Sequence, residues 1–153
     1  MPVEVLGIDH VYLAVRDLAR SSRFYDAVMA VLGYRRAESV IAGDPHVHYY
    51  NRQFGISLRP AHGGTPEHDP YAPGLHHFCF RLIDAAAVDR AAAELRATGV
   101  TVSEPTLYPQ YAPDYYAIFF DDPDGIRLEI TNFRAQRRER MYAWDESITP
   151  RRG

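Results

Sequence analysis

Three residues of metal-ligand type lie on strand-like segments with the same side-chain parity. His10, His77 and Glu129 stand in the alternating segments 8–15, 75–82 and 125–132. Alternate side chains of a strand face opposite ways, so the apolar phase of each segment should pack inward and leave these three residues on the other face. Two imidazoles and a carboxylate suit a divalent transition metal with open coordination positions. The alternative is that each histidine is a hydrogen-bonded structural residue and that the glutamate is solvated.

Other polar or reactive side chains have the same strand parity and should lie on the same face as the three candidate ligands. They are Tyr12, Ser57, Arg59, Cys79, Arg81 and Arg127. An arginine that faces a cleft is costly unless it is paired, so Arg59, Arg81 or Arg127 either recognises a carboxylate, phosphate or enolate or pairs with a protein carboxylate. Cys79 fits a small buried thiol better than a nucleophile, because nothing in the sequence indicates a lowered thiol pKa.

Two further segments offer polar and aromatic groups. His46, His48 and Tyr50 share one face of a strand, where a histidine would serve as a general base or simply form a polar outer face. Residues 108–116 are dense in tyrosine and proline and predict either a lid over a planar substrate or a packed interface. We therefore assign catalytic roles to Tyr12, His48 and Arg127, and substrate-binding roles to Ser57, Arg59, Cys79, Tyr111 and Tyr116.

The elements that must position these residues occur twice. Residues 8–33 and 75–99 share one pattern, a strand with histidine, a polar turn and an amphipathic helix that ends at glycine. Ile56-Ser57-Leu58 and Ile126-Arg127-Leu128 form a second pair at a similar offset. Each half is predicted as βαβββ, with helices after Asp17 and Asp84. The expected strands lie near residues 8–15, 34–40, 45–52, 54–60, 75–82, 100–104, 115–121 and 125–132.

The expected organisation is one domain over residues 1–153, built from modules at about 6–60 and 75–132. Residues 61–74 are rich in proline and glycine and form the linker. The extension 133–153 is rich in arginine and is expected to contain a short helix. We expect Arg134, Arg137, Arg138 and Arg140 to lie on its solvated face, with closure over an anionic substrate as the alternative.

Composition narrows the possible functions. The formal net charge is −3 and acidic and basic residues are mixed, which argues against nucleic-acid binding. All 17 basic residues are arginine, and the absence of lysine excludes a Schiff-base enzyme and a Walker-type phosphate loop. One cysteine excludes an intrachain disulfide. The sequence shows neither a signal peptide nor a membrane span, so we expect a cytosolic protein.

Three segments of the chain together resemble the vicinal-oxygen-chelate superfamily. They are IDHVYLAVRDLARSSRFYDAVMAVLGY (8–34), GLHHFCFRL (74–82) and FFDDPDGIRLEI (119–130). The most specific part is Asp-Pro-Asp-Gly at 122–125 followed by Glu129. The superfamily includes glyoxalase I, bleomycin-resistance proteins, fosfomycin-resistance transferases, methylmalonyl-CoA epimerases and extradiol dioxygenases.

The resemblance implies an α+β fold of two βαβββ modules whose curved mixed sheets enclose a metal cleft, often with modules arranged across a homodimer. It places the three metal ligands at His10, His77 and Glu129. The metal, one of Fe, Mn, Zn, Ni or Co, would chelate two neighbouring oxygens of a small-molecule substrate and stabilise negative charge there. The implied function is a metal-binding enzyme with lyase, isomerase or dioxygenase chemistry.

The chain departs from particular members of the superfamily. Glyoxalase I and the epimerases have a second carboxylate where this sequence has Ser57. Fosfomycin-type transferases have threonine at the position of Tyr12 and use a lysine that this chain lacks, and classical extradiol dioxygenases have four modules. The alternatives to the enzyme are a bleomycin-resistance-like binding protein without catalysis and a fosfomycin-type thiol transferase.

Overall fold

The chain folds into two consecutive modules of the same topology. The structure is a computed structural model that describes residue 3 and residues 5–144. The first module consists of β1 (His10–Val15), α1 (Leu18–Val31), β2 (Arg35–Ile41), β3 (Asp44–Tyr50) and β4 (Gly55–Pro60). The second consists of β5 (His77–Leu82), α2 (Ala85–Ala97), β6 (Thr106–Leu107), β7 (Tyr116–Asp121) and β8 (Arg127–Asn132). The predicted α+β fold with two βαβββ modules is confirmed.

Each module contains one four-stranded mixed sheet. The strand orders are β1-β4-β3-β2 and β5-β8-β7-β6, with β1 parallel to β4 and β5 parallel to β8. Tyr12 pairs with Ser57 in the first sheet, as Cys79 pairs with Glu129 in the second. Ser57 is therefore the first-module equivalent of Glu129, and not of Arg127 as the pairing of Ile56-Ser57-Leu58 with Ile126-Arg127-Leu128 indicated. The two candidate ligand histidines lie on β1 and β5, which are edge strands of their sheets.

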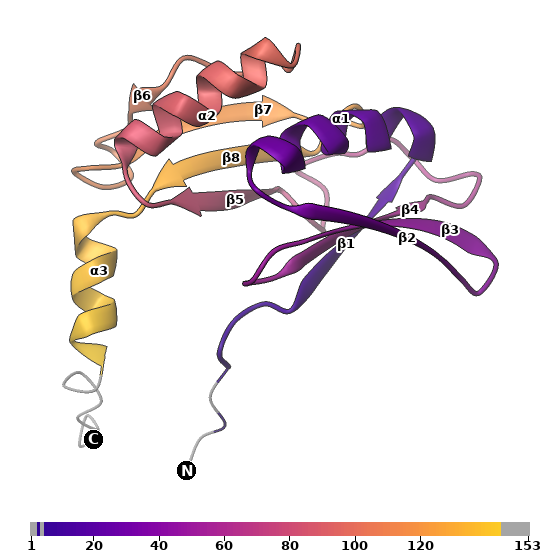
Figure 1. Cartoon of the computed structure of the whole chain (residues 1–153), viewed down its shortest axis with the longest axis horizontal. Helices are drawn as coiled ribbons and strands as arrows, with labels where there is room; N and C mark the ends of the chain where they lie inside the picture. The colour runs from indigo at the N-terminus through magenta and orange to yellow at the C-terminus, as the bar shows by residue number, and fades with distance from the viewer. Residues whose placement is uncertain (1–2, 4, 145–153) are drawn as a thin grey trace.

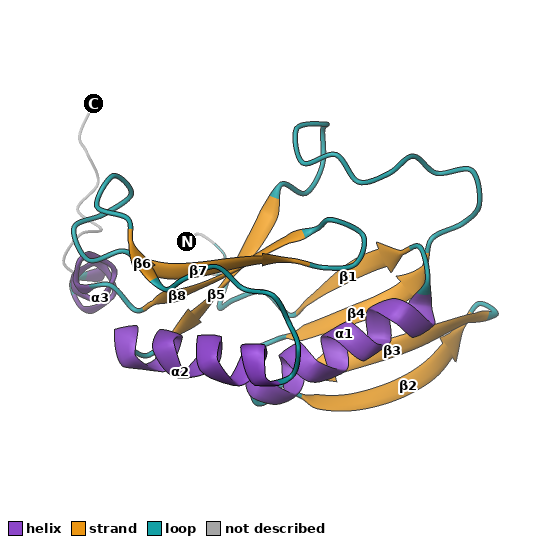
Figure 2. Cartoon of the chain, turned by 90° about the horizontal axis from the view of Figure 1, so that it is seen from above, coloured by secondary structure: helices purple, strands orange, loops and turns teal. Residues whose placement is uncertain are grey.

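The two long helices begin at aspartate caps and cover their sheets from the same side. The Asp17 carboxylate accepts the Arg20 N–H at 2.9 Å, and the Asp84 carboxylate accepts the Ala87 N–H at 2.8 Å. Figures 1 and 2 show α1 and α2 on one side of the two sheets, and the helices also contact each other. The opposite faces of the sheets carry the candidate site residues.

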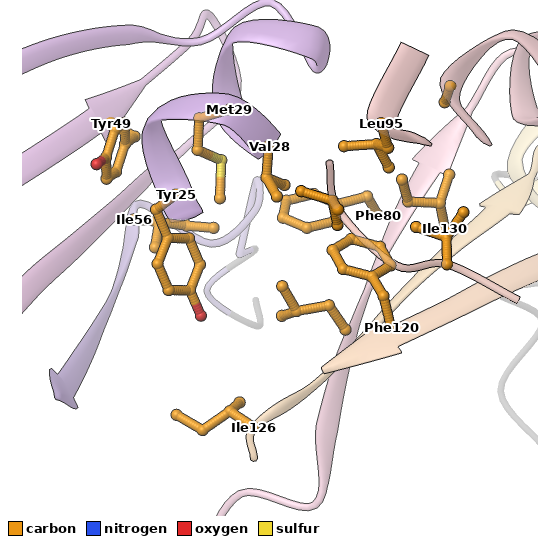
Figure 3. Packing of buried hydrophobic residues seen from close by; sticks show 14 of the residues in the cluster. Tyr25, Val28, Met29, Tyr49, Ile56, Phe80, Leu95, Phe120, Ile126 and Ile130 are labelled. Carbon is orange, nitrogen blue, oxygen red and sulfur yellow. The ribbon is translucent and has the colours of Figure 1, made fainter. Parts of the chain in front are cut away.

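A single hydrophobic core joins the modules. Figure 3 shows Val28 and Met29 of α1 close to Phe80, Leu95 and Phe120 of the second module. The buried Tyr25 hydroxyl donates a hydrogen bond across the module boundary to Asp122 at 3.0 Å. Burial of apolar surface between the modules therefore stabilises them as one unit.

The sequence analysis misplaced the sixth strand. It predicted a strand at 100–104, whereas β6 is a two-residue strand at Thr106–Leu107. The Ser103 hydroxyl accepts the Phe119 N–H at 2.9 Å, so a side chain takes the place of a backbone ladder bond there. Pro105 has no N–H to continue the pairing.

Beyond β8 the chain forms α3 (Ala135–Tyr142), within the segment where a short helix was expected. Figure 1 shows α3 extending away from the second module, beyond the ends of β5 and β8. The remainder of the predicted extension, 145–153, lies outside the described residues. In the described part of the chain, no helix is both long enough and apolar enough to cross a membrane.

Candidate functional site

His77 and Glu129 form the centre of the candidate site. Both side chains face away from the helices, and His77 Nε2 lies 3.4 Å from Glu129 Oε2. Glu129 is only 3% exposed. A buried carboxylate is costly unless its charge is compensated, so the position of Glu129 favours a cationic partner.

The distance between the two side chains fits a shared metal ion. Two ligands about 2.1 Å from a metal at a tetrahedral angle are about 3.4 Å apart. His77 Nε2 and Glu129 Oε2 have this separation. A histidine nitrogen and a carboxylate oxygen also belong to the donor set that zinc, manganese and iron accept. The pair therefore fits two positions of a divalent metal site.

Tyr115 orients the carboxylate. Its hydroxyl donates a hydrogen bond of 2.5 Å to Glu129 Oε1, which leaves Oε2 directed towards His77. Burial, and then the hydrogen bond to Glu129, hold the pKa of Tyr115 well above its usual range. Tyr115 is therefore a neutral donor near neutral pH, as is required of a group that orients a metal-binding carboxylate.

The turn before β8 fixes the position of Glu129 along the chain. The Asp122 carboxylate accepts the N–H groups of Asp124 and Ile126, each at 2.8 Å. Gly125 has a φ of 85°, a conformation that favours glycine. The Asp-Pro-Asp-Gly segment thus starts β8 in the register that places Glu129 beside Phe119 and Cys79.

An aromatic pocket of about 310 Å³ surrounds this pair. Its other lining residues are His76, Tyr111, Tyr115, Phe119 and Arg127. The Tyr111 and Tyr115 rings meet edge to face, with centroids 5.3 Å apart. Such a wall suits a small planar or apolar molecule that also carries polar groups for the centre.

His10 lies in a different pocket, on the first module. This pocket of about 430 Å³ also contains Tyr12, His48 and Ser57. His10 Nδ1 is 2.8 Å from the exposed Asp9 carboxylate. Across residue 3 and residues 5–144, no three histidine, cysteine, aspartate or glutamate side chains surround one metal position. The chain by itself brings together two of the three predicted ligands.

His48 is held between two hydroxyl groups on the first sheet. Its Nε2 lies 2.7 Å from the Ser39 hydroxyl and its Nδ1 lies 2.7 Å from the Ser57 hydroxyl. Tyr12 stands edge-on to the His48 ring at 6.4 Å. These two hydrogen bonds fix the orientation of the imidazole ring, because one serine hydroxyl can donate to one ring nitrogen and the other hydroxyl can accept from the other nitrogen. Tyr12 and Ser57 thus share one surface, as predicted from parity, and His48, for which the sequence left two interpretations open, lies on the same surface.

Two of the predicted arginines are paired with carboxylates. Arg59 bonds to Asp44, which also accepts from His62, and the His62 hydrogen bond and the Arg59 charge lower the pKa of Asp44. Arg127 Nε lies 3.2 Å from Asp121 while its side chain lines the aromatic pocket. For Arg59 the structure favours the protein-paired interpretation over substrate binding.

Cys79 has no sign of activation. The residue is exposed, not buried as expected. Desolvation of its sulfur and the neighbouring Glu129 carboxylate nevertheless hold the pKa of the thiol well above its usual range. A protonated thiol is a poor nucleophile near neutral pH.

One assignment, Tyr116, needs correction, and three pocket residues were missed, Tyr115, His76 and Phe119. Tyr116 turns towards α2, where its hydroxyl donates to Asp89 at 2.8 Å. Tyr115 occupies the pocket position that was predicted for Tyr116. His76 precedes β5, so strand parity does not apply to it, and it lines the pocket with its Nδ1 2.7 Å from His77 Nδ1. Phe119 was also missed, although its parity, opposite to that of buried Phe120, indicated the pocket face.

Comparisons with known proteins agree with this fold. The profile of the Glyoxalase/Bleomycin resistance protein/Dioxygenase superfamily matches residues 7–130. The protein YqjT of Bacillus subtilis is 29% identical over 124 residues, which cover 79% of this chain and 94% of YqjT. A glyoxylase/bleomycin resistance protein/dioxygenase domain from Frankia is 25% identical, with a TM-score of 0.70 over 86% of this chain and all of that one.

A more distant structure includes a bound metal. The fosfomycin resistance protein FosX of Listeria monocytogenes, solved with Mn(II) and a dihydroxypropylphosphonic acid, has a TM-score of 0.63 and 16% identity. The match covers 88% of this chain and 98% of that protein. At this identity the comparison supports the fold alone.

Proposed function

Because the chain belongs to the Glyoxalase/Bleomycin resistance protein/Dioxygenase superfamily, we propose that it is a divalent-metal-dependent enzyme. The metal ligands would be His77, Glu129 and His10. The substrate would be a small oxygenated molecule that chelates the metal through two neighbouring oxygens, and the reaction a lyase, isomerase or dioxygenase type. The observation that carries this proposal is the 3.4 Å separation of His77 Nε2 and the buried Glu129 Oε2.

The protein side chains would have distinct tasks in this reaction. When bound, the metal would supply Lewis-acid stabilisation of negative charge on the substrate oxygens. Tyr115 holds Glu129 in place, while Tyr111 and Phe119 exclude water from one wall of the pocket. His48, hydrogen-bonded to Ser57, is the candidate proton acceptor, because Ser57 occupies the position equivalent to Glu129 and offers no carboxylate base.

We propose that two copies of the chain complete each site. His10 and His77 are on edge strands, and both side chains are substantially exposed. Their pockets belong to different modules. A symmetric homodimer that places β1 of one copy beside β5 of the other would bring His10 to the His77–Glu129 pair, and would do so twice.

Metal binding tests the ligand assignment. The purified chain without a His tag should bind Mn(II) or Zn(II) in titration calorimetry at one ion per chain, and the variants His77→Ala and Glu129→Gln should lose this binding. Glu94→Gln and His62→Ala, both at exposed positions outside the pocket, are the matched controls and should bind as the wild type does. Unchanged affinity in Glu129→Gln would contradict the proposed metal centre.

Mixing two inactive variants tests the shared site. His10→Ala and His77→Ala should each lack the metal site, but a heterodimer of the two retains one intact site. Random re-assortment should therefore restore binding at about a quarter of the wild-type sites. A mixture that restores no binding would show that the ligands come from one chain.

Ligand titration distinguishes the proposed metal-dependent enzyme from the alternative, a binding protein without catalysis. A bleomycin-resistance-like protein would bind its ligand equally well before and after removal of the metal with a chelator. The proposed enzyme should lose affinity for a catechol or other vicinal-oxygen probe when the metal is removed, because the metal provides the contact.

A further inference from the structure

One arginine on the site face of the second sheet has no acidic partner. Arg81 shares the strand and the parity of His77 and Cys79 on β5. Unlike Arg59 and Arg127, which bond to Asp44 and Asp121, Arg81 forms no ion pair within the part of the chain that the structure describes. The groups around Arg81 therefore decide whether it binds an anionic part of a substrate or pairs with a carboxylate of the protein.

The groups around Arg81 are aromatic and positively charged. Its guanidinium lies over the Phe133 ring at 4.7 Å, and Arg138 lies 4.9 Å from the same ring. Partial burial, and then the charges of Arg137 and Arg134, lower the pKa of Arg81. The start of α3 thus adds positive charge to that of β5, and among the described residues Arg81, Arg134 and Arg137 form no ion pair with a carboxylate. The nearby Asp114 carboxylate is engaged in capping α3 through the Ala135 N–H at 2.7 Å.

Arg134, which directly precedes α3, and Arg138 within α3 each have a guanidinium N–H without a hydrogen-bond partner among the described residues. In both residues this group is the Nε–H, and it is shielded from solvent. The Arg134 guanidinium lies 4.7 Å over the Tyr115 ring, and Arg138 donates one bond, to the Ile83 carbonyl at 2.7 Å. The expectation of a fully solvated helix face is therefore wrong for Arg134 and Arg138. Like charges held together without a counterion are unfavourable, and an anion would relieve this cost.

The arginine cluster, which consists of Arg81, Arg134 and Arg137, lies next to the His77–Glu129 pair. Tyr115 contacts Arg134 with its ring and Glu129 with its hydroxyl. Arg81 is two residues beyond Cys79, which pairs with Glu129, and two strand residues span about 7 Å. Figure 1 shows the end of β5 next to the start of α3. One small molecule can therefore reach both places.

We propose that the substrate of this site carries an anionic group, a carboxylate or a phosphate, that Arg81, Arg134 and Arg137 bind beside the metal. The inference rests on the proposed function for the position of the metal. The proposed substrate is therefore an oxygenated acid or a phosphoester. Its two vicinal oxygens would bind the metal, and its anionic group would bind the neighbouring arginines. Guanidinium groups suit both anions because their donors match paired oxygens.

The test uses the full chain after metal removal, titrated with inorganic phosphate and, separately, with acetate, in a low-chloride buffer and followed by NMR chemical shifts. One of the two anions should bind saturably, and Arg81→Gln and Arg137→Gln should each weaken it at least tenfold. Arg90→Gln, at an exposed position on α2, should leave the affinity unchanged. Arg81 and Arg137 are both exposed, so the variants should fold, and their melting temperatures verify this.

The anion that binds more tightly identifies the source of the charge, phosphate or carboxylate. If neither anion saturates, or if Arg81→Gln and Arg90→Gln bind alike, the inference is overturned. His77→Ala separates this result from the proposed function: it should lose the metal and keep the wild-type affinity for the anion. Retained metal binding in His77→Ala would refute the metal centre and leave the anion measurement valid.

Discussion

At the scale of single residues, the site depends on how one buried carboxylate is oriented. Glu129 receives the Tyr115 hydroxyl on one oxygen and presents the other to His77. Loss of the hydroxyl would leave the proposed metal ligand, Glu129, in place but free to rotate. Outer groups of this kind support the ligand geometry rather than the metal bond itself.

We predict that Tyr115→Phe weakens metal binding by about tenfold, because the carboxylate loses the bond that fixes it. Titration with Mn(II) measures the effect. Tyr108→Phe is the matched control, since the Tyr108 ring stacks on Tyr111, which lines the pocket, but its hydroxyl is not bonded to Glu129. Equal affinities in the two variants would show that Tyr115 does not position the ligand.

At the scale of elements, two aspartates set the residues at which the long helices begin. They thereby set where the chain leaves each edge strand. Asp84 follows β5 and caps α2, as Asp17 follows β1 and caps α1. Cap residues of this type satisfy backbone N–H groups that have no partner within the helix. The caps thereby fix the crossing from each edge strand to its helix.

We predict that Asp84→Ala lowers the free energy of unfolding by about 1 kcal/mol, because the Ala87 N–H loses its acceptor. Asp84→Asn should cost less, since its side-chain oxygen still accepts. Urea denaturation followed by circular dichroism measures both. A loss in Asp84→Asn as large as that in Asp84→Ala would argue against capping as the cause.

At the scale of the whole molecule, aromatic residues join the modules. The Tyr34 ring meets Phe54 of the first module and Phe80 of the second, with centroids 5.7 Å and 6.3 Å away. Burial raises the pKa of Tyr34 to about 12. The folded protein therefore holds this proton at a pH where the unfolded chain has released it.

We predict a loss of stability above pH 10 that depends on Tyr34. A raised tyrosine pKa contributes stability that is complete below the unfolded value of 10.0 and is lost as the pH rises through about 12. Between these limits the wild type should lose about 1–2 kcal/mol relative to Tyr34→Phe, the partial exposure of the ring reducing the full linkage value. Urea denaturation at pH 9 and pH 11.5 tests this, and parallel losses in both proteins would contradict it.

The sequence alone determined the repeated modules, the helix starts and the sheet face of the candidate residues on β1, β4, β5 and β8. These features depend on local periodicity and capping, which neighbouring residues fix. Strand parity does not extend to His76, which precedes β5. Aromatic density in 108–116 did not separate Tyr115 from Tyr116, because only the register of β7 decides which ring faces the pocket.

The tertiary structure decided which groups meet. It brought His77 and Glu129 together through the parallel pairing of β5 with β8, and it placed His10 in the other module. It also paired Arg59 and Arg127 with carboxylates and left Arg81 among arginines. Such contacts join residues far apart in the chain, so they follow from sheet order and core packing, which no local pattern specifies.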